Sequence, residues 1–235
     1  MANLGALAQK YDKFVIFDTE TTGLNFQRDE IIEFSAVVLE KQGGEVVVTK
    51  EYDNLVTLSP GNTVPPKITE LTGISTQDIL QRGVAKQQVC ADIAEMFAGN
   101  TLLLAYNAHF DLSFLFYLLL RSGDPTILKG KDKLDLLTVY KDRKPYPHRL
   151  LNAIEAYELS GKVVNSHRAI DDVLATVAVM EKMVEELDDL DRYINLFGYN
   201  PKYGIDGKPI GSVDYKPQGF HNANAQFVIK LYDRK

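Results

Sequence analysis

The sequence predicts an α/β fold in which helices cover both faces of a mixed β-sheet. Two observations support this prediction. Three β-rich segments follow one another near the start of the chain, and a glycine-containing turn joins the second to the third, which is typical of an antiparallel meander. Segments with helical spacing of apolar residues then alternate with short apolar runs, which is typical of parallel strands connected through helices.

Each element of this fold follows from a local pattern. The run 14–17 is wholly apolar and β-rich, so we expect a strand that is buried on both faces. The turn 41–44 contains two glycines and should close a hairpin. The other predicted strands cover 31–40, 45–58, 101–105 and the residues around Leu134, and the predicted helices cover 84–97, 111–121, 149–159 and 169–187.

The chain divides into a folded domain and a C-terminal appendage. A length of 235 residues fits one large domain, which we place at 1–190. Glycine and proline are concentrated in 195–219, where Asp206-Gly207 favours a hairpin, and 226–232 has the pattern of one more strand. We therefore expect 191–235 to be a tail with a hairpin rather than a second domain.

The composition excludes several classes of protein. A charged fraction of 25% and a hydrophobic fraction of 45% are ordinary for a globular domain. The net charge of −6 argues against nucleic-acid binding through a broad basic surface, although metal ions can supply positive charge locally. The single cysteine, Cys90, lies among apolar residues, so we expect a buried thiol in a reducing compartment. Asp111 interrupts the apolar window 102–120, and we expect a soluble, cytoplasmic protein without a targeting segment.

The first candidate site is the segment 18–24 (DTETTGL), which follows the buried run 14–17 directly. Residues two apart on an extended chain point to the same side, so Asp18 and Glu20 should present their carboxylates together. They also lie at the carboxyl end of a buried strand, where open α/β sheets bind ligands. A simple turn does not need both acids, and this favours a functional site.

Two further segments add polar side chains to this site. The segment 106–111 (YNAHFD) links a predicted strand to a helix, and Asp111 either stabilises the helix N-terminus or joins an acidic cluster. The segment 167–172 (HRAIDD) opens the last helix, where His167 is a candidate base beside a ligating acid. Carboxylates without cysteine ligands or a histidine pair predict Mg²⁺ or Mn²⁺ rather than zinc.

Helical geometry separates the two adjacent acids in the last helix. At 100° per residue, its mostly apolar residues cluster around one direction, which should face the core: Ala169, Val173, Thr176, Val177, Met180 and Val184. Asp172 projects to the edge of this face and Asp171 to the solvent side. Asp172 is therefore the acid predicted to reach the site.

These segments, in this order and spacing, resemble the motifs of the DEDDh (DnaQ-like) 3′–5′ exonucleases. The segment 71–75 (LTGIS) also resembles the proofreading branch of that family, which includes the exonuclease domains of DNA polymerase III epsilon and PolC-type. The resemblance covers 13–184 and implies a ribonuclease H-like fold. One departure is Tyr106, where many relatives carry histidine, and this position flanks the site.

The resemblance implies a role for each motif residue. Four carboxylates would bind two divalent metal ions: Asp18, Glu20, Asp111 and Asp172. His167 would take the proton from the attacking water. Five residues would bind the terminal nucleotide: Thr21, Gly23, Leu24, Asn107 and Phe110. For Leu24 and Phe110, packing in the core is the alternative. Two divalent ions would add four positive charges, which takes the net charge from −6 to −2.

The substrate and the partner stay open at this point. The implied reaction releases nucleoside 5′-monophosphates from a single-stranded or frayed 3′ end. Thr21-Thr22 after Glu20 resembles the DNA-proofreading branch more than the oligoribonuclease branch, and this resemblance favours DNA, while an RNA-trimming enzyme is the alternative. A non-catalytic module that docks on a polymerase is disfavoured because all five motif residues are present. A DNA polymerase is a candidate partner. Basic residues interleaved with Tyr140 and Tyr146 either assist binding or, as we favour, form a solvated loop: Lys141, Arg143, Lys144 and Arg149.

Overall fold

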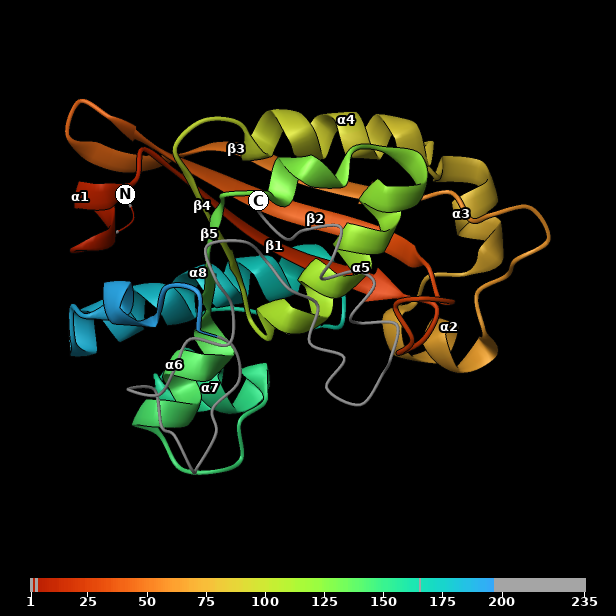
Figure 1. The fold of residues 1–235 in the computed structure, drawn as a ribbon. Coiled ribbons are helices and arrows are strands. Elements are labelled where there is room, and N and C mark those ends of the chain that lie inside the picture. Colours follow the sequence, from red (N-terminus) through yellow and green to blue (C-terminus); the bar gives the residue numbers. More distant parts are fainter. Residues whose placement is uncertain (1, 3, 165, 197–235) are drawn as a thin grey trace.

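A computed structural model describes residues 2, 4–164 and 166–196, and its centre is a five-stranded mixed sheet (Figure 1). The strands are β1 (Lys13–Thr21), β2 (Ile31–Gln42), β3 (Glu45–Leu55), β4 (Thr101–Ala105) and β5 (Asp132–Asp135). Their order across the sheet is β3-β2-β1-β4-β5. β2 runs antiparallel to β1 and β3, whereas β4 runs parallel to β1 and β5. The predicted meander followed by parallel strands is confirmed.

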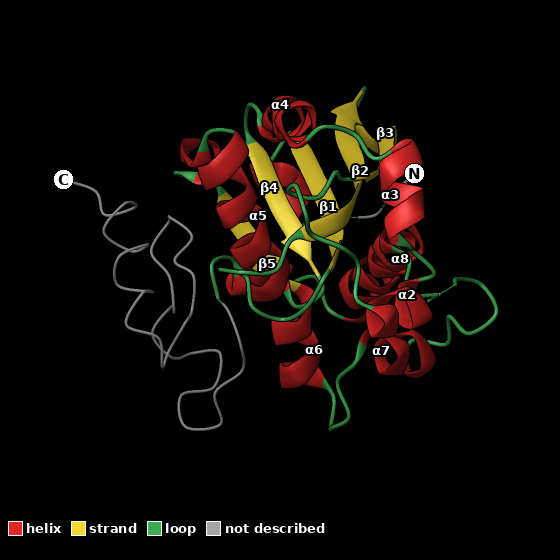
Figure 2. Ribbon diagram, turned by 90° about the vertical axis from the view of Figure 1, so that its right-hand side faces the viewer, coloured by secondary structure: helices red, strands yellow, loops and turns green. Residues whose placement is uncertain are grey.

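Helices cover both faces of the sheet, as predicted (Figure 2). One face carries α4 (Lys86–Phe97) and α5 (Ala108–Ser122), and the other carries α6 (Leu136–Arg143), α7 (Leu150–Ala156) and α8 (Ala169–Glu186). The shorter elements are α1 (Leu7–Lys10), α2 (Pro66–Thr72), α3 (Thr76–Arg82), η1 (Pro125–Leu128) and η2 (Leu190–Tyr193). Within the described part of the chain, none of the helices combines the length and apolarity that crossing a membrane requires.

β1 is buried on both faces, and this fixes the direction of its acids. The apolar run 14–17 alternates between a hydrophobic cluster on the α8 side and another on the α4–α5 side. All four side chains are at most 1% exposed. Because side chains alternate along a strand, Asp18 and Glu20 continue the α8 side and Thr19 the α5 side. The strand extends through Thr21, so both acids belong to regular β structure.

Most of the predicted elements are present, with shifts of a few residues at their ends. The helix predicted over 111–121 begins three residues earlier, at Ala108, and its N-cap Asn107 has a left-handed backbone with φ of 70°. Asp111 therefore lies in the first helical turn. The helices α1, α2, α3 and α6 were not predicted, because four to eight residues give too little helical periodicity. Cys90 is 4% exposed, and burial raises the pKa of its thiol to about 11, as expected of an inert side chain.

The structure corrects the expectation that the basic residues after β5 form a solvated loop. Helix α6 continues to Arg143, whose side chain is 7% exposed. Its guanidinium donates to the carbonyl oxygens of Met183 at 2.6 Å and Leu187 at 2.9 Å. Arg143 thus satisfies carbonyl groups at the C-terminal end of α8 and is not available to bind a nucleic acid.

Residues 190–196 pack against the domain. Tyr193 is 2% exposed, and its hydroxyl donates to Asp142 at 2.9 Å. The amide of Asn195 donates to the carbonyl of Lys133 at 2.7 Å, and its Oδ1 accepts from the amide of Lys133 at 3.0 Å. The hairpin expected at 206–207 and the strand expected at 226–232 lie outside the described residues.

Candidate active site

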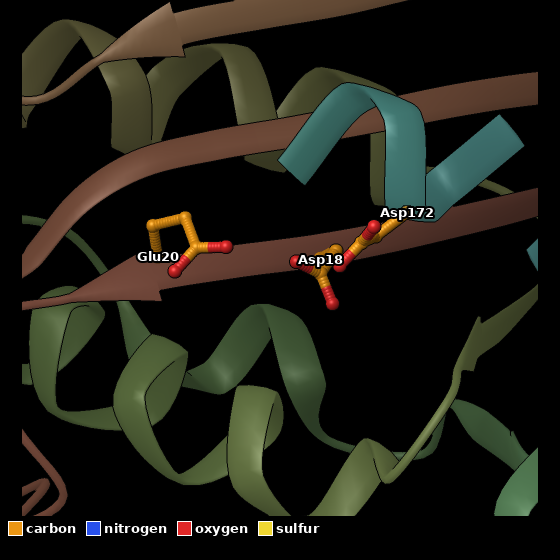
Figure 3. A group of neighbouring side chains, drawn as sticks. All are labelled: Asp18, Glu20 and Asp172. Carbon is orange, nitrogen blue, oxygen red and sulfur yellow. The ribbon is translucent and has the colours of Figure 1, made fainter. Parts of the chain in front are cut away.

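Three carboxylates from β1 and α8 meet at the carboxyl end of β1. Asp18, Glu20 and Asp172 each place one carboxylate oxygen within 4.8 Å of the others. Figure 3 shows Asp18 and Glu20 on the strand and Asp172 reaching toward them from the start of α8. Asp172 is 9% exposed, so the first turn of α8 is turned toward the sheet. We call these three residues the carboxylate cluster.

The orientation of α8 differs in detail from the sequence prediction. Ala175, Val179 and Met183 lie outside the predicted core face but are all 0% exposed, whereas Val177, which belongs to that face, is only partly buried. The buried arc is therefore centred closer to Asp172, which lies inside it rather than at its edge. Asp171 is partly buried and accepts a hydrogen bond from the Ser166 hydroxyl. The structure brings Asp172, and not Asp171, to the carboxylate cluster.

Asp111 lies beside the carboxylate cluster and is tied to the strand that carries it. Its side chain is 2% exposed. Oδ1 accepts hydrogen bonds from the amide of Thr19 at 3.0 Å and from the Thr19 hydroxyl at 2.8 Å. Thr19 stands between the two acids of β1 and points to the opposite face. Asp111 therefore approaches β1 from the α5 side, and it is not one of the three mutually close residues.

Burial and mutual repulsion raise the pKa values of these carboxyl groups. Burial is the largest cause for Asp18, whose pKa is raised well above its usual range, and the charge of Asp111 comes next. Burial, followed by the charges of Asp172 and Glu33, raises the pKa of Glu20 to about 8. Burial also raises the pKa of Asp111 to about 7. A divalent cation would relieve this repulsion, because it favours the charged form of each acid.

His167 lies at the entrance to α8. Its backbone φ is 58°, in the left-handed region that few non-glycine residues occupy. The side chain is exposed and lines a cavity of about 410 Å³ together with Asp172 and Asn107. The structure thus brings His167 to an open space that it shares with one member of the carboxylate cluster.

The loop after β1 holds three of the residues expected to bind the terminal nucleotide. The hydroxyl of Thr21 donates to the carbonyl of Gly23 at 2.7 Å. A Cβ atom on Gly23 would lie 2.4 Å from Oδ2 of Asp29, so a larger residue would displace that side chain. Leu24 is 85% exposed, which excludes the core-packing alternative for this residue.

The other two expected nucleotide-binding residues lie at the start of α5. Asn107 is exposed at the N-cap and lines the same cavity as His167. Phe110 is partly buried, and its ring packs against Phe114 with centroids 4.9 Å apart. Part of the Phe110 side chain is therefore packed against Phe114, and the rest is accessible to solvent. Tyr106, the departure from the family pattern, is 9% exposed and donates to the carbonyl of His148 at 2.9 Å.

Two buried acids support the site and were missed in the sequence. Asp135 is 1% exposed and accepts from the amides of Asn107 at 3.0 Å and Ala108 at 3.1 Å, which fixes the start of α5. Glu33 is 0% exposed and accepts from Arg168 and from the amide of Ala169. The available signal was an isolated acid inside an apolar strand, since buried acids are rare unless they are paired.

Residues 15–180 match a family model described as exonuclease, of the RNase T type. The chain belongs to this exonuclease family. This membership assigns it to the 3′–5′ exonuclease class of hydrolases. It is 36% identical over 183 residues to the PolC-type DNA polymerase III of Clostridium perfringens, covering 75% of this chain and 12% of that protein. It is 31% identical over 175 residues to the DNA polymerase III subunit epsilon of Treponema pallidum, covering 73% of this chain and 76% of that protein.

The fold of this exonuclease chain is also similar to that of a solved structure. A crystal structure of Escherichia coli exonuclease I in complex with a dA16 oligonucleotide superimposes with a TM-score of 0.68 at 22% identity. The match covers 77% of this chain and 42% of that one. This likeness confirms the predicted ribonuclease H-like fold. The chain spans only 12% of the length of the PolC-type relatives.

Proposed function

We propose that this chain is a metal-dependent 3′–5′ exonuclease that hydrolyses the terminal phosphodiester bond of DNA and releases nucleoside 5′-monophosphates. The observation that carries the proposal is the carboxylate cluster, whose three oxygens lie within 4.8 Å of one another. It lies at the carboxyl end of β1, where sheets of this kind bind ligands. The family match over residues 15–180 supports the reaction class.

Mg²⁺ or Mn²⁺ fits the side chains present. The cluster offers only carboxylate oxygens, which are the ligands that these hard cations prefer. Asp18, Glu20 and Asp172 would hold the ions together with Asp111, which approaches from the α5 side. When bound, two such ions stabilise the attacking and the leaving oxygens of an in-line displacement at phosphorus.

His167 is the proposed general base. Histidine is the side chain that most often fills this role, and His167 is exposed beside Asp172 in the cavity of about 410 Å³. The imidazole would accept the proton of the attacking water and pass it to solvent through the open side of that cavity.

The terminal nucleotide is proposed to lie between the loop after β1 and the start of α5. Leu24 presents an exposed apolar side chain, and the accessible part of Phe110 offers an aromatic surface for a base. Thr21, Gly23 and Asn107 supply the polar contacts in this proposal. No wide basic face is needed, because the footprint covers only the end of the strand.

DNA is the proposed substrate and a DNA polymerase the proposed partner. The relatives over the matched region are DNA polymerase III proteins. The structural neighbours include exonuclease I in complex with DNA oligonucleotides. An RNA-trimming activity and a non-catalytic docking module are the alternatives that the following experiment separates.

The deciding experiment measures mononucleotide release from matched single-stranded DNA and RNA oligonucleotides of one sequence. We expect 5′-monophosphates from the 3′ end of DNA with Mg²⁺ or Mn²⁺, and none in excess EDTA. The variant Asp18→Asn/Glu20→Gln, purified in parallel, controls for contaminating nucleases. Full activity in EDTA contradicts the metal-dependent reaction, faster release from RNA indicates the RNA-trimming alternative, and DNA binding without hydrolysis indicates the docking module.

A further inference from the structure

Glu33 is a buried acid on β2 whose carboxylate holds the entrance of α8. The side chain is 0% exposed and stands opposite Glu20 in the β1–β2 pairing. Oε1 accepts from Nε of Arg168 at 2.9 Å and also from Nη2. Oε2 accepts from the amide of Ala169 at 2.9 Å. A buried charge is tolerated when its oxygens are paired, and here one short segment pairs both of them.

Arg168 and Ala169 stand between two groups of the proposed active site. His167 directly precedes Arg168, and its φ of 58° makes the chain turn sharply there. Asp172 follows one helical turn later, and its amide donates to the carbonyl of Arg168 at 3.1 Å. Because Glu33 binds both the Arg168 guanidinium and the Ala169 amide, it fixes the direction in which α8 starts. It also fixes the direction in which the chain approaches the helix.

The fixed point of this contact lies in the sheet itself. Glu33 is on the strand adjacent to β1, in register with Glu20. The proposed metal ligands Asp18 and Glu20 therefore lie in the same hydrogen-bonded strand pair as Glu33, which binds the start of α8. A displacement of α8 relative to this pair would move Asp172 away from Asp18, so its alignment depends on the contact between Glu33 and residues 168–169.

We infer that Glu33 is a positioning residue that aligns His167 and Asp172 with the acids of β1. This inference rests on the proposed metal-dependent reaction and adds a residue that acts through α8. Glu33 is not proposed as a ligand, because Arg168 and Ala169 occupy both of its carboxylate oxygens.

The test compares Glu33→Gln, Arg168→Gln and the double variant in the full chain. Calorimetry measures Mn²⁺ affinity and the number of ions bound, and DNA hydrolysis gives kcat and KM. Loss of a residue that orients metal ligands costs about 10–100-fold in affinity or activity. We expect Glu33→Gln to lose about 10-fold or more in Mn²⁺ affinity and in kcat, with the change mainly in kcat.

The double variant distinguishes positioning from simple charge. It has the net charge of the wild type, because one acidic and one basic side chain are both replaced. If Glu33 acts by position, the double variant keeps the low kcat and the weak Mn²⁺ binding of the single variants. If Glu33 acts only through its charge, Arg168→Gln binds Mn²⁺ more tightly and the double variant recovers wild-type affinity, which overturns the inference.

Glu30→Gln is the matched control. Glu30 is a second buried acid, 7% exposed, and its carboxylate pairs with Lys86 and accepts from the amide of Ser59 at 3.0 Å. Its loss should lower the thermal unfolding midpoint as Glu33→Gln does, while kcat and Mn²⁺ affinity stay within about two-fold of wild type. A purely structural role for Glu33 would make the two variants alike in all readouts, and that result overturns the inference.

Five further outcomes are decisive. Wild-type kcat and Mn²⁺ affinity in folded Glu33→Gln overturn the inference. The loss of one bound ion with the other unchanged also overturns it, because that result indicates a ligand.

If Glu33→Gln does not fold, Arg168→Gln decides, since that side chain is 38% exposed. A lowered kcat then supports positioning and an unchanged kcat overturns it. If the wild type hydrolyses nothing, the proposed function fails, while the Mn²⁺ titrations still decide the role of Glu33. A wild-type chain that binds no Mn²⁺ overturns both.

Discussion

Individual carboxylates at the end of β1 differ in what their oxygens contact. Oδ1 of Asp111 accepts both bonds from Thr19, and both oxygens of Glu33 are paired with the entrance of α8. Asp18, Glu20 and Asp172 instead place oxygens close to one another. Glu33 thus uses both of its oxygens to hold the scaffold, whereas Asp111 uses Oδ1 to hold β1 and still belongs to the proposed ligand set with the carboxylate cluster.

The raised pKa values predict how the stability of the metal-free chain depends on pH. Folding raises the pKa of Glu20 from 4.5 to about 8 and that of Asp111 from 3.8 to about 7. The folded state therefore favours the neutral acids. Their contribution to the free energy of unfolding is complete below the unfolded pKa values and is lost as pH rises through about 7 to 8.

We accordingly expect the thermal unfolding midpoint in EDTA to fall between about pH 6 and pH 9. Saturating Mg²⁺ should remove most of this fall, because the cation stabilises the charged acids. Circular dichroism melts in both conditions make the comparison. A midpoint in EDTA that rises over this range would contradict the predicted sign.

Replacing His167 should separate proton transfer from metal binding. His167→Ala should lower kcat by about 10²–10⁴-fold, the usual contribution of a positioned base. Mn²⁺ affinity should stay unchanged because every carboxylate remains. The control is His148→Ala, since His148 lines the same cavity but its ring contacts the carbonyl of Lys144 at 2.9 Å. Near-wild-type turnover of His167→Ala would show that another group accepts the proton.

Among the elements, α8 decides which acid reaches the site. Its buried arc includes Asp172, Val179 and Met183, and its entrance is held to β2 through Glu33. Helix α5 is fixed in a comparable way, because Asp135 at the end of β5 accepts the amides of Asn107 and Ala108. Each helix that brings an acid to β1 is thus held at its first turn by a buried acid on a strand.

The register of α8 predicts unequal effects for its two adjacent acids. Asp172→Asn should remove nearly all activity and weaken Mn²⁺ binding, because Asp172 belongs to the carboxylate cluster. Asp171→Asn should stay within a few-fold of wild type, since Asp171 contacts Ser166 at the helix entrance. Parallel kcat measurements with Mn²⁺ titrations compare the two variants, and the opposite ranking would show that the wrong acid has been assigned to the site.

In the whole molecule, the sheet order brings the site together. β1 lies between antiparallel β2 and parallel β4, so the carboxyl ends of β1, β4 and β5 meet at one edge. The carboxylate cluster, Asp111 and Asp135 all lie at this edge. Residues 190–196 complete the core on the α8 side, where Leu190 and Tyr193 join its hydrophobic cluster and Asn195 pairs with Lys133 of β5.

Truncation tests how much of the chain the chemistry needs. A chain that ends at residue 196 should hydrolyse a short single strand within a few-fold of the full chain, because every proposed site residue is retained. A chain that ends at residue 191 should melt at a lower temperature, since it loses buried Tyr193 and the pairing of Asn195 with Lys133. A folded 1–196 chain without activity would show that the tail contributes to the site.

The sequence by itself determined the fold class, the three motifs and the acids worth testing, because period, apolar runs and acid spacing are local properties. It placed Asp18 and Glu20 on one side of a buried strand, as the structure has them. Only the tertiary structure decided the orientation of α8, the bond from Thr19 to Asp111, and the pairing of Glu33 with Arg168. These contacts join residues that are 92 and 135 positions apart, and no local pattern records which distant side chain will satisfy a buried charge.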